Sequence, residues 1–212
     1  WGRGGSGEDA GVPWADPAPT PAVIAAAGGD LRTCAALEPD GHVECWGRRY
    51  VNGSIGSVWD PPSAIPGLPG MVQIDGHEEL FCGLTSAGKV WCWDREDPGA
   101  TSEIGMGPAL DSTALDSTAL DSTAIDSTAI DVAAGYGHAC ALDQDGRAWC
   151  WGLPQWGGLG PGWDFEYDLK PHAPLVVPDT PLDLIDISAG RFHTCAVHAG
   201  GEVWCWGWDV NG

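Results

Sequence analysis

Eight cysteines carry the clearest chemistry in this chain of 212 residues. They fall in four copies of a short segment, which read TCAALEPDGHVECWG, FCGLTSAGKVWCWD, ACALDQDGRAWCWG and TCAVHAGGEVWCWG. The two cysteines of a copy can form a disulfide, bind a metal ion or remain buried thiols. Zinc sites favour closely spaced pairs such as CxxC, and one wide pair per copy would supply only two ligands. Disulfides are therefore the favoured interpretation, with zinc or free thiols as alternatives.

Each copy predicts a β-hairpin that sets its two cysteines side by side. If Cys140 lies opposite Cys150 in an antiparallel pair, the loop is residues 144–146. This loop ends on glycine, where a type I turn closed by a bulge needs a positive φ. The second and fourth copies give the same count. The first copy has one residue more between its cysteines, so its loop is residues 38–41, with proline at the second position of the turn.

Directly opposite positions select four disulfides from the many pairings that eight cysteines allow. The predicted pairs are Cys34 with Cys45, Cys82 with Cys92, Cys140 with Cys150, and Cys195 with Cys205. In the chain-entropy model, closing a loop of this size stabilises the fold by about 2.5 to 3 kcal/mol. Disulfides at this density predict an extracellular, cell-surface or periplasmic location. Because the chain opens on Trp1 rather than methionine, we expect an export signal outside this segment or already removed.

The tryptophans of the hairpins predict sheets that are covered on both faces. Alternation along the strand puts Trp149 and Trp151 on one face and Cys150 on the other, and the second and fourth copies repeat this arrangement. A small antiparallel sheet packed between copies of itself is the arrangement of propeller blades. The 32 glycines and 17 prolines leave little room for helices, which agrees with an all-β fold.

Charge and hydropathy exclude two classes of partner. With 9 basic and 30 acidic residues the formal charge is −21, which disfavours nucleic acid and anionic membranes. The acidity favours a cationic partner or serves solubility alone. The longest apolar run without glycine, AVIAAA at residues 22–27, is too short to span a bilayer, so no membrane insertion is expected.

Several smaller motifs suggest chemistry that their context does not support. GRGGSG at residues 2–7 fits a dinucleotide-binding pattern, but no strand pattern precedes it and no helical pattern follows. DQDG at residues 143–146 resembles part of a calcium loop, and the hairpin turn already explains it. His138 and His193 recur once per unit, which favours hydrogen bonds at strand ends over metal ligation. The sequence therefore predicts no catalytic residue, no cofactor and no metal site.

Each unit also opens with a short β-like segment before a glycine and closes with WG or WD and a glycine-rich turn. The opening segments are VIAAAGG from residue 23, VQIDG from 72, IDVAAG from 130 and IDISAG from 185. With the hairpins, these parts resemble the regulator of chromosome condensation repeat family, in its secreted bacterial form with a disulfide in each repeat. His138 and His193 stand where that family carries its histidine, and Arg32 takes this place in the first unit. The resemblance implies a ring of seven four-stranded blades.

The repeat count predicts a single partial β-propeller over residues 1–212, present as about four blades of an expected seven. Missing blades are then expected in a longer form of the chain, and a closed ring of four is the alternative. The predicted units are residues 1–22, the tail of a preceding unit, followed by 23–71, 72–129, 130–184 and 185–212. Residues 109–129 repeat the pentad ALDST or AIDST, which predicts a long loop, or alternatively a pentapeptide β coil.

These features together predict a non-enzymatic scaffold that binds a protein or glycan through the loops of one rim. Tryptophans in the variable turns are the predicted contact residues, namely Trp156, Trp163 and Trp208. The alternatives are a purely structural surface or lipoprotein module and an enzyme that uses a rim pocket. The family resemblance also suggests guanine-nucleotide exchange or inhibition of a secreted enzyme, and the disulfides and acidity disfavour exchange.

Overall fold

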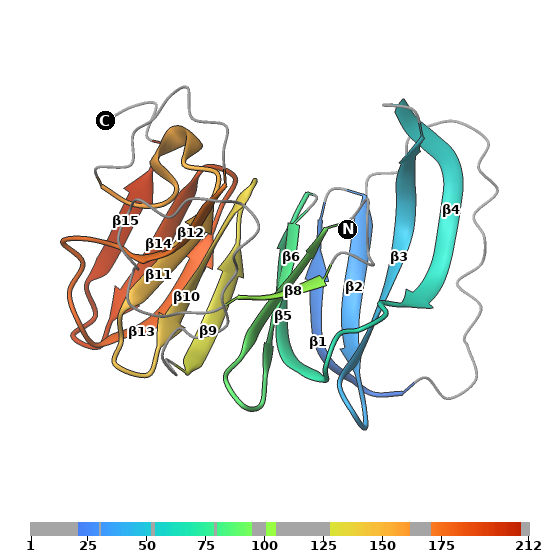
Figure 1. Cartoon of the computed structure of the whole chain (residues 1–212), viewed down its shortest axis with the longest axis horizontal. Helices are drawn as coiled ribbons and strands as arrows, with labels where there is room; N and C mark the ends of the chain where they lie inside the picture. Colours follow the sequence, from blue (N-terminus) through green and yellow to red (C-terminus); the bar gives the residue numbers. More distant parts are fainter. Residues whose placement is uncertain are drawn as a thin grey trace.

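A computed structural model shows four antiparallel sheets that stand side by side in chain order (Figure 1). The structure describes residues 21–29, 31–51, 54–78, 80–94, 101–104, 128–161 and 171–208. The GRGGSG motif and most of the pentad tract, residues 109–127, lie outside the described residues. The first three sheets have four strands each and the fourth has three, so the prediction of an all-β fold with about four blades is confirmed.

Each sheet is a simple meander, which we call a blade and number along the chain. Blade 1 consists of β1 (Val23–Gly28), β2 (Arg32–Leu37), β3 (His42–Val51) and β4 (Ser54–Ala64). Blade 2 consists of β5 (Met71–His77), β6 (Leu80–Thr85), β7 (Val90–Asp94) and β8 (Thr101–Ile104). Blade 3 consists of β9 (Ala129–Ala134), β10 (His138–Asp143), β11 (Ala148–Gly152) and β12 (His172–Val176), with the 3-10 turn η1 (Gln155–Gly157) before β12. Blade 4 consists of β13 (Leu184–Ala189), β14 (His193–His198) and β15 (Val203–Gly207).

The hairpin register is the one that the cysteine spacing predicts. In blade 3, Cys140 pairs with Cys150 and Ala141 pairs with Trp149. The other three blades also place their cysteines opposite each other. The last glycine of each hairpin loop has a φ between 72° and 95°. In every blade the two cysteine Cα atoms are 4.1 Å apart and the sulfurs are bonded, so each disulfide clasps the two central strands of its own sheet.

Each blade packs its cysteine-bearing face, here the cysteine face, on the tryptophan-bearing face of the next blade. Between blades 2 and 3, one buried cluster joins the Cys82–Cys92 disulfide to Trp149 and Trp151. The two other interfaces are built in the same way, from the Cys34–Cys45 disulfide against Trp93 and the Cys140–Cys150 disulfide against Trp206. Burial of apolar area therefore couples neighbouring blades, while the disulfides stiffen each blade from within.

A half-buried carboxylate also joins three blades along their first strands. Asp131 in β9 accepts a hydrogen bond from Gln73 Nε2 in β5 at 2.6 Å and one from the backbone N–H of Ile187 in β13 at 3.1 Å. Burial raises the pKa of Asp131, and the hydrogen bonds from Gln73, Ile187 and Val132 oppose this rise. The first strands are thus fixed relative to one another by polar bonds as well as by packing.

The backbone conformation at the WG motif requires glycine in three blades. Gly47, Gly152 and Gly207 have φ values of 131°, 102° and 111°, a region that other residues rarely adopt. At Gly152, an added Cβ would lie 2.4 Å from the carbonyl oxygen of Gly137. Only glycine therefore fits at the end of the third strand, where the backbone passes close to the turn between the first and second strands.

We expect Gly152→Ala to lower the free energy of unfolding by on the order of 2 kcal/mol, because it adds both backbone strain and a clash with Gly137. Urea denaturation monitored by tryptophan fluorescence measures this change. Gly28→Ala is the matched control, since nothing lies within 4 Å of an added Cβ there. Equal stability of the two variants would contradict this account of the WG motif.

The propeller is open, because the cysteine face of blade 4 is uncovered. The cysteines of the first three blades are at most 6% exposed. In blade 4, Cys205 is exposed, Cys195 is half-buried and Val203 is 63% exposed. Among the described residues no further sheet packs on this face, and blade 4 has three strands where the other blades have four. The row of blades is thus a partial propeller.

Exposure predicts that the Cys195–Cys205 disulfide is reduced before the other three in a protein of these 212 residues. Thiol–disulfide exchange requires the attacking thiolate to reach a sulfur atom, which burial prevents. Mild reduction followed by alkylation and mass spectrometry should show Cys195 and Cys205 labelled first. Simultaneous labelling of all four pairs, or earlier labelling of Cys140 and Cys150, would contradict the prediction.

Candidate interaction surface on one rim

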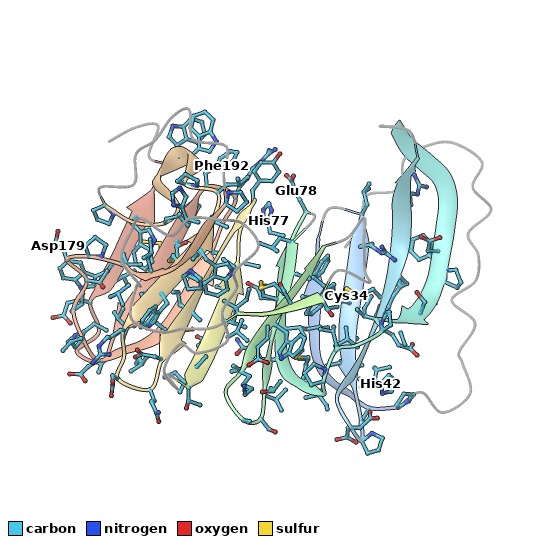
Figure 2. The ribbon with its side chains drawn as sticks, in the orientation of Figure 1. Cys34, His42, His77, Glu78, Asp179 and Phe192 are labelled. Atoms are coloured by element: carbon cyan, nitrogen blue, oxygen red, sulfur yellow. A yellow bond between two sulfur atoms is a disulfide. The ribbon has the colours of Figure 1, made fainter. Side chains whose placement is uncertain are left out.

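Four aromatic side chains and one arginine gather at one end of blades 3 and 4. We call this group the aromatic rim cluster; it consists of Tyr136, Trp156, Arg191, Phe192 and Trp208. The centroid of the Phe192 ring lies 5.5 Å from those of Tyr136, Trp156 and Trp208, and the two indoles are 4.9 Å apart. Phe192 lies at the same end of the sheets as His77 and Glu78 of blade 2, and His42 lies at the opposite end (Figure 2).

Two equivalent turns position the centre of the cluster. Tyr136 lies between β9 and β10 of blade 3, and Arg191 and Phe192 lie between β13 and β14 of blade 4. The backbone N–H of Tyr136 donates a hydrogen bond to the carbonyl oxygen of Arg191 at 3.0 Å, which ties the two turns together. The Tyr136 and Phe192 rings meet edge to face, an arrangement that aromatic pairs favour.

The segment after β11 brings Trp156 to the same place. Trp156 lies in η1 with a φ of 66°, so the chain reverses sharply there. The next residues are held against blade 4, because Trp206 Nε1 donates a hydrogen bond to the carbonyl oxygen of Gly158 at 3.1 Å. An added Cβ at Gly157 would already touch Gly207 at 3.4 Å. Trp156 therefore reaches across the blade boundary to Phe192 and to Trp208, which follows β15.

Arg191 links the cluster to blade 2. Its guanidinium lies over the rings of Tyr136 and Phe192, 5.3 and 5.1 Å from their centroids, which is cation–π geometry. Its Nη2 atom is 3.2 Å from Glu78 Oε1 in the β5–β6 turn. An ion pair whose arginine is exposed to solvent adds little stability. It does place a cation, its counter-ion and four aromatic rings on one rim of three consecutive blades.

His138 and His193 occupy equivalent positions with different surroundings. His138 is buried, and its Nε2 atom lies 3.0 Å from Oγ1 of Thr194 in the next blade. Burial lowers the pKa of His138 to about 4, and the nearby His77 and His193 rings add to this effect. His138 is thus a neutral hydrogen-bonding bridge between blades, whereas His193 is exposed. Within the described residues no group of three or more His, Cys, Asp or Glu side chains is placed to hold a metal ion.

The structure brings together two of the three tryptophans that the sequence suggested as contact residues. Trp156 and Trp208 are 41% and 45% exposed and touch each other in the cluster. Trp163 lies outside the described residues. Sequence reasoning missed Tyr136, Arg191 and Phe192. Tyr136 and Arg191 directly follow the glycine after the first strand of their unit, and Phe192 comes one residue later. That shared position was the signal that could have identified them.

The fold and the repeats define the class of protein, an open β-propeller of disulfide-clasped blades. Residues 129–155 and 184–212 match the family model of the Regulator of chromosome condensation (RCC1) repeat. The chain therefore carries repeats of this family, which confirms the resemblance seen in its motifs. No helix among the described residues is long and apolar enough to cross a membrane.

Known relatives are longer proteins with different functions. The Ultraviolet-B receptor UVR8 of Arabidopsis thaliana is 27% identical over 186 residues, which cover 84% of this chain and 40% of the receptor. The human E3 ubiquitin-protein ligase HERC2 is 29% identical over 174 residues, which cover 79% of this chain and 3% of the ligase. A crystal structure of Kap60 bound to yeast RCC1 (Prp20) matches with a TM-score of 0.61 and 22% identity, covering 86% of this chain and 42% of the matched chain. At this identity the structural match shows the fold alone.

Proposed function

We propose that this protein is a non-catalytic binding scaffold that recognises a partner protein through the aromatic rim cluster. One observation carries the proposal: loops from two blades place four aromatic rings together on one rim, and three of the rings are more than a third exposed. Tryptophan, tyrosine and arginine are the residues most enriched at the centres of protein interfaces. The cluster contains all three.

The blades below the cluster support this role because they hold its loops rigidly. Each loop starts or ends on a strand that a disulfide clasps, β10 or β11 in blade 3 and β14 or β15 in blade 4. A preorganised surface loses less conformational entropy when it binds, so more of its contact energy appears as affinity. A purely structural module would have no need of exposed, mutually packed tryptophans in these loops.

The disulfides also indicate in which kind of compartment this function is carried out. Four intramolecular disulfides indicate an oxidising location outside the cytosol, where such bonds persist. We propose the extracellular medium, the cell surface or the periplasm. The partner is then expected to be a protein of the same compartment or of a surface that faces it.

We further propose that an additional blade of the same type packs on the cysteine face of blade 4. Three times within the chain, a cysteine face is covered by the tryptophan face of the next blade. On blade 4 the equivalent Val203 and Cys205 are exposed. The chain also spans 40% of the length of the plant receptor. A longer form of the protein that includes such a blade should protect Cys195 and Cys205 from the early alkylation predicted above.

The experiment that tests the binding function compares two variants of the disulfide-intact chain. Proteins captured from the surface and secreted fractions of the source by the wild type and by Trp156→Ala/Trp208→Ala are quantified, and any that differ are purified and titrated. We expect the double variant to bind such a partner at least 10-fold more weakly, since interface tryptophans commonly contribute more than 1.4 kcal/mol each. Trp59→Ala, which removes a tryptophan that is 54% exposed on β4, is the matched control. Identical captured sets would refute the proposal.

A further inference from the structure

We infer that the aromatic rim cluster binds a basic protein segment and receives an arginine or lysine side chain of that segment on the Trp156–Trp208 pair. This inference rests on the proposed function and names the chemistry of its partner. Three observations carry it: the cluster already holds a guanidinium, two of its rings stay open, and the chain as a whole is strongly acidic.

The guanidinium already present is that of Arg191. It lies over two rings at once, 5.3 Å from the Tyr136 centroid and 5.1 Å from the Phe192 centroid. Its charge is balanced by Glu78 Oε1 at 3.2 Å, and the Glu78 side chain is largely buried. The surface therefore has both the ring geometry and the opposite charge that stabilise a cation on aromatic rings. This internal pair leaves little net charge there to repel a second cation.

The second position is formed by the two indoles. Trp156 and Trp208 lie 4.9 Å apart with their planes inclined at 47°, and both are more than 40% exposed. Tryptophan is the side chain that binds cations most strongly through its ring face. At an exposed site one such contact changes affinity by about 2- to 5-fold, so two indole faces are expected to change it by about 5- to 20-fold.

The charge of the whole chain favours a basic partner over a glycan. Thirty acidic residues against 9 basic ones create a field that attracts cations and accelerates their association. A neutral glycan gains nothing from this field. It would also need polar side chains free to bind its hydroxyl groups, whereas Arg191 of the cluster already binds the neighbouring Glu78. A basic protein segment uses both the rings and the field.

The test measures binding of two defined peptides to the disulfide-intact chain by fluorescence anisotropy at two salt concentrations. One peptide is a labelled decapeptide of alternating arginine and serine, and the other replaces each arginine by citrulline, which has nearly the same shape and no charge. We expect the arginine peptide to bind at least 10-fold more tightly. Trp156→Leu/Trp208→Leu, which keeps apolar side chains but removes the ring faces, should weaken it 5- to 20-fold. Trp59→Leu should change it less than 2-fold.

Arg191→Gln provides an independent readout that a plain hydrophobic patch would not give. This variant removes the internal cation and leaves the rings of Tyr136 and Phe192 and the carboxylate of Glu78 available. The arginine peptide should then bind about 2- to 5-fold more tightly than it binds the wild type. If the double leucine variant does not fold, as judged by circular dichroism, Arg191→Gln and the single variant Trp156→Phe still decide the question, since phenylalanine should weaken binding about 2-fold.

Several results would overturn the inference. Unchanged binding to the double variant would mean that diffuse acidic charge alone holds the peptide. Equal affinity for the citrulline peptide would mean that charge plays no part. If a panel of glycans or uncharged peptides binds in a cluster-dependent way while the arginine peptide does not, the proposed binding function stands and this inference fails. If no ligand or captured partner depends on the cluster, both fail.

Discussion

Asp143→Ala is expected to lower the free energy of unfolding by about 3 to 5 kcal/mol, the largest single-residue effect that we predict. Asp143 is 1% exposed at the end of β10, and its carboxylate organises the blade 3 hairpin loop. Oδ1 accepts hydrogen bonds from the backbone N–H groups of Asp145 and Arg147 at 3.0 and 2.9 Å. Oδ2 accepts one from Trp149 Nε1 at 2.8 Å. Removal of the carboxylate leaves these donors without their acceptor.

A comparison with blade 4 indicates what this carboxylate does. In blade 4 the equivalent residue is His198, and the tryptophan equivalent to Trp149 is Trp204, which is 44% exposed. Trp149, bonded to Asp143, is buried. The aspartate thus allows the indole N–H to enter the interface between blades without losing a hydrogen bond.

Chemical denaturation of three variants tests this prediction. Asp143→Asn keeps an acceptor for the two backbone N–H groups but sets an amide against the indole, so its stability should lie between those of the wild type and Asp143→Ala. Asp145→Asn alters only an exposed ion pair with Arg147 and should change stability by less than about 0.5 kcal/mol. A loss below about 1 kcal/mol for Asp143→Ala would show that the loop does not depend on this carboxylate.

Acidification from pH 7.5 to 4.5 is expected to destabilise the wild type by about 2 to 3 kcal/mol relative to His138→Gln. Burial lowers the pKa of His138 to about 4, from about 6.5 in the unfolded chain. Above pH 6.5 the ring is neutral in both the folded and the unfolded chain, and its contribution to stability is fully present. As the pH falls from 6.5 toward 4, only the unfolded chain takes up a proton, so stability is lost in this window.

The difference in the free energy of unfolding between the wild type and His138→Gln separates the effect of His138 from that of the carboxylates, which titrate in the same pH range in both proteins. Urea denaturation at a series of pH values gives the free energy of unfolding of each. Glutamine can still hydrogen bond to Thr194 Oγ1, the partner of His138, but does not titrate. Parallel pH profiles for wild type and His138→Gln would contradict a buried, neutral histidine at this position.

Local patterns in the sequence predicted the blade correctly because a hairpin is a local structure. Cysteine spacing and loop length determine which residues face each other, and a glycine at the loop end meets the need for a positive φ. Alternation then predicts the faces of the strand, so Trp149 and Trp151 were assigned to one face before any packing was known. These arguments do not depend on the rest of the chain.

The contacts between blades could not be predicted in the same way. Asp131 bonds to Gln73 and Ile187, residues more than 50 positions away in either direction. Trp156 and Phe192 meet only because η1 crosses a blade boundary. A repeat pattern shows that units stack, but the offset between neighbouring units is a three-dimensional quantity. The rim cluster therefore became visible only in the structure.

A disulfide map of the unreduced protein is the most direct test of the central claim, that each pair of cysteines clasps the two middle strands of one blade. Peptides from digestion at acidic pH, where exchange is slow because few thiolates form, are sequenced by mass spectrometry. The account predicts four links and no free thiol, namely Cys34–Cys45, Cys82–Cys92, Cys140–Cys150 and Cys195–Cys205. A link between cysteines of different blades would contradict it.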